Sequence, residues 1–387
     1  MAKYLFFKLK AVSYQSYLYF ADSLAESLKR LGDTVLFFDS EKEPLENMER
    51  LTNESFDAIF DFNSALPKVT MDDDTYFLDH IDSPFYNIIL DHPLYHHDSL
   101  KHKLKNMHVL CLDERHAKYI KDNYPHIKSV ELFAMTGQTA AKTIPYKDRK
   151  YDVLFTGSYT SSNEILDALC KIPPFMQKIT LDVIDIMKAD ASLQVHEALN
   201  TVLPEIEDSD IILEHYPLHV QGCFLADTFI RAYKREEVLK TLVKADISLT
   251  LCGNGWEKFK DVASKENVTI LDEIPFSDTF SLMQNSKISV NIMPIFTHGT
   301  HDRVYSACLN SSVCVTDKSS ILEKQFVDRQ DICFADISRP TSFSDIISDL
   351  LLSEEKAVAI SSNGFIYADK NHTWDSRANT LKSLIIQ

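Results

Sequence analysis

Apolar residues in the first third of the chain form short runs separated by segments with helical spacing. Residues 4–7 are one such run, and apolar side chains then recur at helical spacing from Tyr17 to Leu31, with Gly32 where a helix C-cap is expected. Further apolar runs lie at 34–38, 58–60, 87–90, 109–112 and 130–133. Strands that alternate with helices pair in parallel through right-handed crossovers. The pattern therefore predicts a doubly wound, Rossmann-like α/β domain over residues 1–145.

A second α/β pattern follows a polar and charged segment at 143–150, which we interpret as a linker. Residues 151–156 form an apolar run that leads into Gly157 and Ser158. Similar runs return at 247–252, 268–271, 288–292 and 313–316. Between them, residues from about 163 to 244 have a mostly helical pattern with proline breaks at Pro173, Pro174, Pro204 and Pro217. We predict a second Rossmann-like domain over 151–370 with a helical insertion at about 163–244, and a C-terminal helix over 371–387.

Composition narrows the possible partners and the compartment. A length of 387 residues suits two domains, and the formal net charge of −17 disfavours binding to nucleic acid or to anionic membranes. No apolar run is long enough for a transmembrane segment, and the first apolar run is too short for the core of a signal peptide. The chain has 7 cysteines and no CxxC pair, which disfavours a disulfide framework or a cysteine-based zinc site. We expect a cytoplasmic protein.

Three glycines indicate where a ligand would bind in the second domain. Ligands of open parallel sheets bind beyond the carboxyl ends of the strands. Of the chain's 8 glycines, Gly157, Gly253 and Gly255 directly follow strands there. Glycine lets the backbone approach a phosphate closely, although each residue could also serve only a tight turn. GxGxxG and GxxxxGK[ST] motifs are both absent from the sequence, so nicotinamide redox chemistry and P-loop phosphoryl transfer have no local support.

The segment 297–305 is the richest in functional groups. Arg303 could bind a diphosphate in a bidentate manner, and His298, beside Gly299, could donate to a phosphate oxygen. The alternative is a solvated loop ahead of a helix. Because the segment follows a strongly apolar strand, we favour an anion-binding role.

Acidic and histidine side chains cluster around one predicted strand of the first domain. Asp91 and His92 directly follow the run 87–90, and Asp82 precedes it. A carboxylate or imidazole at such a position could be the general base for an acceptor hydroxyl, so these three are the predicted catalytic residues. Two alternatives stay open, a surface loop or a metal site. The metal site would use His92, His96, His97 and Asp98, whose spacing matches no standard zinc pattern, and we predict no metal.

Several segments of the second half resemble one family in the same order and spacing. They are 151–158, the Gly-x-Gly-Trp turn at 253–256, the strand 288–292 with the block 303–317, and the His-Thr-Trp-x-x-Arg motif at 372–377. Together they resemble the C-terminal domain of CgeB-like, group 1-type bacterial glycosyltransferases over about 151–380. The first half carries only the fold pattern.

This resemblance implies a GT-B fold, in which two Rossmann-like domains face each other. It implies a metal-independent hexosyltransferase of polysaccharide biosynthesis that needs no cofactor. The donor, a nucleoside-diphosphate sugar such as a UDP- or GDP-sugar, would bind the C-terminal domain, and a hydroxyl on a glycan or cell-surface precursor would be the acceptor. Strand-end position and resemblance together give the predicted donor-binding residues: Gly157, Ser158, Gly253, Gly255, Trp256, Asn291, Pro294, His298, Gly299, Arg303, Ser306, Thr316 and Asp317.

Two positions depart from the family pattern. Ser306 stands where the family has a glutamate that meets the ribose or the donor sugar, and Ser311 stands where it has a glycine. A serine hydroxyl hydrogen-bonds a ribose more weakly than a carboxylate does. Two other functions therefore stay open: a sugar-nucleotide epimerase of the same fold, against which the missing glutamate argues, and a catalytically degenerate sugar-binding protein.

Overall fold

The computed structural model describes residues 1–9, 16–203 and 216–385, and the chain forms two compact units. The first unit comprises Met1–Gln138, His298–Asp302 and Asp369–Gln387, and the second comprises Thr139–Thr297 and Arg303–Ala368. Two short segments from the second half of the chain therefore belong to the first unit. The domain bounds given above, 1–145, 151–370 and 371–387, stay a prediction.

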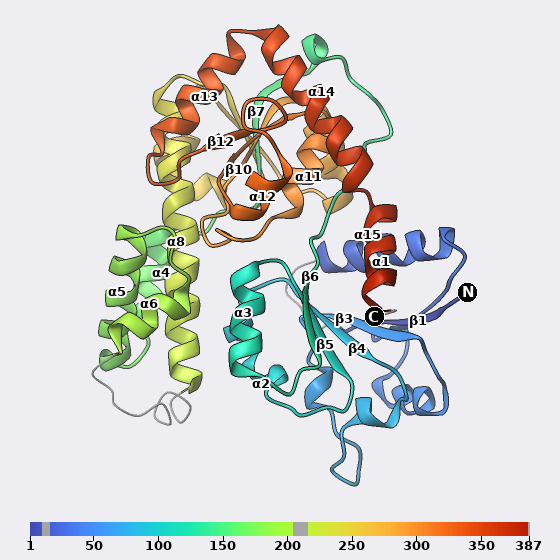
Figure 1. Cartoon of the computed structure of the whole chain (residues 1–387). Helices are drawn as coiled ribbons and strands as arrows, with labels where there is room; N and C mark the ends of the chain where they lie inside the picture. The colour runs from blue at the N-terminus through green and yellow to red at the C-terminus, as the bar shows by residue number, and fades with distance from the viewer. Residues whose placement is uncertain (10–15, 204–215, 386–387) are drawn as a thin grey trace. The chain divides into compact units, whose positions relative to one another are not determined.

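The first unit is built on a six-stranded parallel sheet with the order β2-β1-β3-β4-β5-β6 (Figure 1). Its strands are β1 (Lys3–Lys8), β2 (Thr34–Asp39), β3 (Ala58–Phe62), β4 (Phe85–Ile89), β5 (Met107–Cys111) and β6 (Ser129–Leu132). Each overlaps one of the apolar runs in the sequence. Buried parallel strands are apolar on both faces, which is why short runs were sufficient to predict them.

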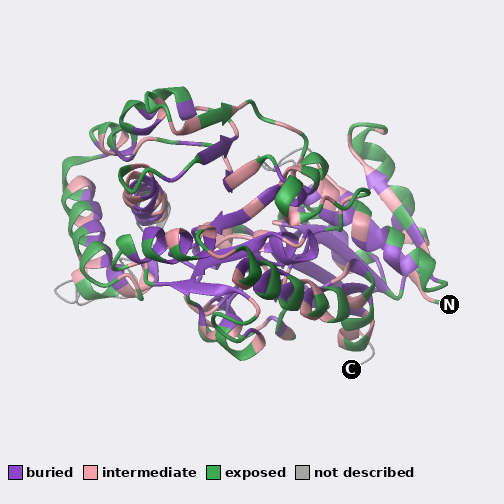
Figure 2. Ribbon diagram, turned by 90° about the horizontal axis from the view of Figure 1, so that it is seen from above, coloured by how far each residue is buried: buried purple, intermediate pink, exposed green. Residues whose placement is uncertain are grey.

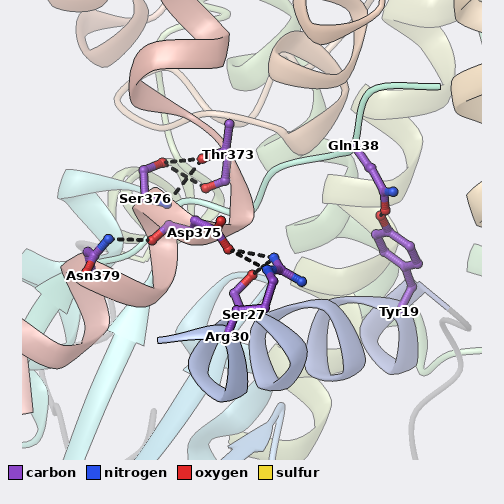
Figure 3. A network of polar contacts seen from close by, with 8 residues as sticks. All are labelled: Tyr19, Ser27, Arg30, Gln138, Thr373, Asp375, Ser376 and Asn379. Carbon is purple, nitrogen blue, oxygen red and sulfur yellow. Dashed lines mark hydrogen bonds and ion pairs between the residues drawn. The ribbon is translucent and has the colours of Figure 1, made fainter. Parts of the chain in front are cut away.

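Helices and short 3₁₀ turns flank this sheet. They are α1 (Ser16–Arg30), α2 (His97–Leu100), α3 (Glu114–Asn123) and α15 (Trp374–Ile385), with 3₁₀ turns η1 (Leu45–Asn53), η2 (Leu66–Lys68), η3 (Phe77–His80) and η4 (Pro93–His96). Gly32, after α1, has φ of +90°, as its predicted C-cap position requires. The C-terminal helix α15 packs beside α1, and Arg30 of α1 donates to Asp375 of α15 and to Ser27 of its own helix (Figure 3).

The second unit has its own six-stranded parallel sheet with the order β12-β11-β10-β7-β8-β9. Its strands are β7 (Tyr151–Thr156), β8 (Leu249–Cys252), β9 (Val268–Leu271), β10 (Ser286–Asn291), β11 (Val313–Asp317) and β12 (Cys333–Ala335). The sequence analysis missed β12, because three residues are too few to give a pattern. Both sheets and their flanking helices confirm the predicted doubly wound α/β class.

An inserted group of helices separates β7 from β8. The described members are α4 (Ser162–Leu169), α5 (Pro174–Ala189), α6 (Val195–Val202) and α8 (Tyr216–Lys244). Pro204 and the other residues of 204–215 lie outside the described ranges. Figure 1 shows α8 running from the sheet of the second unit into a layer with α5 and α6. A Cβ on Gly222 of α8 would lie 2.6 Å from Thr180 Oγ1 of α5, so glycine permits close packing of the two helices.

The remaining helices flank the second sheet. They are α9 (Lys260–Ala263), α10 (Thr279–Gln284), α11 (Asp302–Leu309), α12 (Ser320–Gln325), α13 (Thr341–Leu351) and α14 (Glu354–Asn371), with η5 (Tyr146–Asp148), η6 (Trp256–Lys258) and η7 (Phe276–Asp278). Figure 2 shows that the strands are largely buried, whereas the helices alternate between buried and exposed positions. Within the described ranges, no helix is both long and apolar enough to cross a membrane. The seven cysteines all lie in the described ranges, and none of them forms a disulfide bond there.

Candidate functional site

Two glycine turns of the second unit lie against each other where β7 and β8 end. Gly157, Gly253 and Gly255 have φ of +142°, +139° and +85°, a region that disfavours other residues. Gly157 N donates to Cys252 O over 2.9 Å, which joins the first turn to the end of β8. A Cβ on Gly253 would lie 2.6 Å from Gly157 O, and one on Gly255 would lie 2.7 Å from Tyr159 O. The close packing of the two turns therefore requires glycine at 253 and 255.

Trp256 supports these turns from within the core. Its side chain is fully buried, and its Nε1 donates to Gly157 O over 2.9 Å. The indole packs against the rings of Tyr159 and Phe155 at centroid distances of 5.2 and 5.7 Å. A buried indole has no free surface for a ligand, so Trp256 positions the turn, in contrast to the direct donor contact we expected of it.

Arg303 is held at the same edge of the second sheet by two neighbouring strands. It lies in the first turn of α11, where its Nε donates to Asn291 Oδ1 of β10 over 3.2 Å. Its Nη1 donates to Thr156 O at the end of β7 over 3.0 Å. Asn291 Nδ2 in turn donates to Thr316 Oγ1 of β11 over 3.0 Å. The fold thus brings together three of the predicted site residues, Arg303, Asn291 and Thr316, from separate elements.

Three further predicted site residues, Asp317, Pro294 and Ser306, are buried. Asp317 Oδ1 accepts a hydrogen bond of 2.9 Å from Met293 N, so it holds the backbone that follows β10. Burial is the main cause that raises the pKa of Asp317 to about 7. Ser306 lies on α11 with only 1% of its surface exposed. In this position Ser306 packs inside the unit.

A second arginine, Arg235 of α8, reaches the same turn and was missed by the sequence analysis. Its Nη1 donates to Ser158 O over 2.9 Å. Its guanidinium carbon lies 5.1 Å from the centre of the Phe155 ring, and that of Arg303 lies 5.9 Å from the same ring. No local motif surrounds Arg235, and it is 68 positions before Arg303. Only the path of the inserted helix brings it to β7.

The predicted phosphate-binding pair His298 and Gly299 belongs to the first compact unit, whereas Arg303 belongs to the second. His298 N donates to Asp113 Oδ2 over 3.0 Å, and Glu114 N donates to His298 O over 2.9 Å. A Cβ on Gly299 would lie 2.6 Å from Leu112 O. Gly299 therefore has a packing reason of its own, which is the close approach of its backbone to the end of β5.

The structure separates Asp82 from the other two predicted catalytic residues, Asp91 and His92. Asp91 follows β4 at the carboxyl edge of the first sheet, where its Oδ2 accepts from Asn63 Nδ2 over 3.0 Å. His92 is buried, and its Nδ1 accepts from Leu94 N over 3.1 Å, so it caps the turn η4. Asp82 precedes β4 and is exposed, which places it at the opposite edge of the sheet. Asp82 and Asp91 cannot serve one site, because a whole strand lies between them.

The alternative of a histidine metal site gains no support from the geometry. Within residues 1–9, 16–203 and 216–385, no group of three or more His, Cys, Asp or Glu side chains is arranged to hold a metal ion. The ring of His92 instead packs edge-on against His116 and Tyr119, at centroid distances of 4.8 and 5.2 Å.

Comparison with known proteins gives matches for part of the sequence and for the fold. Residues 231–383 match a family model described as glycosyl transferase-like. A search of curated proteins finds no match. The matched range begins on α8 and includes Arg235, the Gly-x-Gly-Trp turn, the Arg303 group and the closing motif.

Solved structures resemble the chain over nearly its whole length. T4 phage BGT in complex with UDP-glucose has 11% identity and a TM-score of 0.58, with 100% of this chain and 99% of that chain covered. Sucrose-phosphate synthase from Thermosynechococcus elongatus has 9% identity and a TM-score of 0.56, with 99% and 98% covered. Anabaena HepE in complex with UDP and glucose has 10% identity and a TM-score of 0.52, with 100% and 99% covered.

The fold is therefore that of the GT-B glycosyltransferases, with two doubly wound units as predicted. The C-terminal part of the chain also carries a glycosyl transferase-like sequence. The narrower likeness to the CgeB-like group stays a prediction.

Proposed function

We propose that this protein transfers a sugar from a nucleoside-diphosphate sugar to a hydroxyl on a glycan or cell-surface precursor, without a metal ion. The observation that carries the proposal is the Arg303 guanidinium, fixed by Asn291 and Thr156 beside the glycine turns. A UDP-sugar is the favoured donor, because T4 phage BGT and Anabaena HepE are described with UDP-glucose, UDP or glucose.

The chemistry of the leaving group explains why an arginine belongs at this position. As the bond from the sugar to the diphosphate breaks, negative charge grows on the diphosphate oxygens. A cation that is already oriented stabilises that charge without reorganising during the reaction. In our proposal the guanidinium of Arg303 supplies this positive charge, so no divalent ion is needed. Backbone at the Gly157 and Gly253 turns would allow the phosphates to approach closely.

The acceptor hydroxyl must lose a proton when it attacks. Asp91 is the best candidate for this role, because it is partly exposed at the carboxyl edge of its sheet and Asn63 orients its carboxylate. His92 is a weaker candidate, since its ring is buried and its Nδ1 already accepts a hydrogen bond. We therefore assign the general base to Asp91.

The test compares Arg303→Gln with wild type in transfer from UDP-sugars and GDP-sugars to a panel of glycan acceptors. Removing a group that stabilises the leaving diphosphate should lower kcat/KM by about 10²–10³-fold, the loss typical of such donors. Arg339→Gln is the matched control, because Arg339 is an exposed arginine of the same unit. Wild-type activity should also survive EDTA.

Three results would argue against the proposal. Equal activity of Arg303→Gln and wild type would show that Arg303 does not bind the diphosphate. Recovery of the donor as its C2 epimer, without an acceptor, would indicate the epimerase. Donor binding without turnover on every acceptor would indicate a sugar-binding protein.

A further inference from the structure

We propose that Arg235 of the inserted helix α8 is a second cationic ligand for the donor diphosphate and acts beside Arg303. The inference rests on the proposed function and deepens it, since it assigns part of phosphate recognition to the insertion. The two guanidiniums approach one ring, Phe155, and donate to two carbonyls of one turn, Ser158 O and Thr156 O. They therefore form a pair of like charges at the end of β7.

The acidic neighbours of Arg235 on α8 are engaged elsewhere. Glu236 accepts from Tyr159 Oη over 2.9 Å and from Ser162 N and Oγ over 2.9 and 2.7 Å. Glu237 accepts from the side chains of Tyr233 and Lys234, and Asp227 pairs with Arg231 over 3.4 Å. Within the described part of the chain, no carboxylate forms an ion pair with Arg235. The fold thus leaves its charge without a counterion of its own.

Two nitrogens of the Arg235 guanidinium, Nε and Nη2, donate no hydrogen bond to the described residues. Its Nε is buried and has no hydrogen-bond partner among the described residues. Its Nη2 makes no hydrogen bond to them either, and this atom is not completely buried in a side chain that is half-buried overall. An arginine presents its donors in a planar fork that fits phosphate oxygens. The Nη2 of Arg235 therefore has the donor capacity to bind an anion beside Ser158.

Electrostatics indicates the charge of that anion. Burial first, and then the charges of Arg303 and Arg231, lower the pKa of Arg235 to about 9. The side chain still carries its proton at neutral pH, so the repulsion between the arginines remains in the folded protein. An anion bearing two or more charges would relieve that repulsion, whereas a single charge would relieve less. A diphosphate is the group of this kind that a nucleoside-diphosphate sugar brings.

A purely structural role for Arg235 is the competing explanation. Its bond to Ser158 O could serve only to anchor α8 to the turn after β7. The two roles differ in one respect that can be measured: an anchor affects folding and all ligands alike, whereas a diphosphate ligand affects only those ligands that carry the second phosphate.

The experiment measures the dissociation constants of UMP, UDP and inorganic pyrophosphate by calorimetry for wild type, Arg235→Gln and Arg235→Lys. We expect wild type to prefer UDP over UMP, and Arg235→Gln to reduce this preference by about 10-fold or more, as a lost charge-assisted hydrogen bond does. Arg235→Lys keeps the charge and should keep part of the preference. Lys240→Gln is the control, because Lys240 lies on α8 and pairs with Asp261. It should leave the preference unchanged.

Each outcome separates the inference from the proposed function. If Arg235→Gln folds, binds UDP and keeps the wild-type preference, the inference is wrong and the transferase proposal stands. If wild type binds pyrophosphate through Arg235 but no nucleotide, the anion site stands and the proposed donor is wrong. If wild type binds none of the three ligands, the inference is wrong, and the transfer assay with UDP-sugars and GDP-sugars decides the proposed function. Should Arg235→Gln fail to fold, Arg235→Lys is compared with wild type in its place. A UDP-over-UMP preference that stays at its full value at raised ionic strength would contradict a charge-based role.

Discussion

Ser311 adopts a strained backbone conformation, and the sequence alone indicated only that this position departs from the family pattern. It follows α11 with φ of +51°, in the left-handed region that L-residues other than Asn and Asp rarely adopt. The resembled family has glycine at this position, and the backbone conformation supplies the physical reason. Ser311 O also accepts from Arg149 Nη1 over 2.6 Å, so the strained turn is tied to the start of the second sheet.

We expect Ser311→Gly to stabilise the protein. Relief of the left-handed strain is worth roughly 1–2 kcal/mol, and the greater freedom of glycine in the unfolded chain offsets about 0.5–1 kcal/mol of it. A net gain of up to about 1 kcal/mol should appear in urea unfolding as a higher midpoint with an unchanged slope. Ser311→Ala, which keeps the Cβ, is the control and should show no gain. A Ser311→Gly variant no more stable than Ser311→Ala would refute the explanation.

At the scale of elements, the closing His-Thr-Trp-x-x-Arg motif anchors α15 to the first unit. Arg377 Nη2 donates to His372 Nδ1 over 2.5 Å, and both side chains are buried. Burial, together with the charge of Arg377, lowers the pKa of His372 to about 3, so the imidazole stays neutral and accepts. Trp374 packs against Tyr19 and Phe20 of α1 at centroid distances of 6.1 and 5.9 Å. The motif that resembles a family signature therefore fixes a helix, at a place remote in sequence from the glycine turns.

The packing of Trp374 should contribute far more to the free energy of unfolding than the ion pair beside it. Trp374→Ala removes a large buried ring and should cost about 3–5 kcal/mol of unfolding free energy. Asp375→Ala breaks the bond to Arg30 drawn in Figure 3, but both side chains are more than half exposed, so about 0–1 kcal/mol is expected. Denaturant unfolding of the two variants measures the difference. Equal losses would mean that the polar network, rather than the ring, holds α15.

On the scale of the whole molecule, each unit buries one carboxyl group in or at the end of a central strand. Asp61 of β3 accepts from Ser64 Oγ over 2.7 Å, and Asp317 of β11 accepts from Met293 N over 2.9 Å. Burial is the largest cause in both cases, and it raises each pKa from 3.8 to about 7. Between these two values the folded chain keeps protons that the unfolded chain releases. Both groups therefore make stability fall as pH rises from about 4 to 7.

Removing either carboxyl should make the loss of stability between about pH 4 and pH 7 less steep. For each group, the free energy of unfolding falls by up to about 1.4 kcal/mol per pH unit between the unfolded and the folded pKa. Asp61→Asn and Asp317→Asn keep an acceptor oxygen but cannot ionise, so each variant should gain stability relative to wild type as pH rises from 5 to 7.5. Urea unfolding at the two pH values measures this gain. Asp345→Asn, an exposed position on α13, is the control. A gain no larger than that of the control would contradict the assignment.

The sequence predicted most of the fold because its signal is local. Strands buried on both faces appear as apolar runs, and helices such as α1 show their spacing without any partner. The three-residue strand β12 was missed because so short a segment gains its identity from pairing with β11. At the candidate site, Gly157, Gly253 and Arg303 could be proposed from the sequence because they directly follow strands or lie in strand-end loops. Arg235 was not found, because nothing in the helical sequence around it marks a ligand.

The sequence by itself determined the class of fold, the glycine turns and the position of Arg303 in a strand-end loop, since these depend on residue types at fixed distances along the chain. Tertiary structure decided which distant side chains meet. It brought Arg235 to the turn after β7, buried Trp256 and Ser306, grouped His298 and Gly299 with the first unit, and separated Asp82 from Asp91. The physical reason is that contacts between elements depend on helix paths and sheet order, which packing of the whole unit selects and no local pattern encodes.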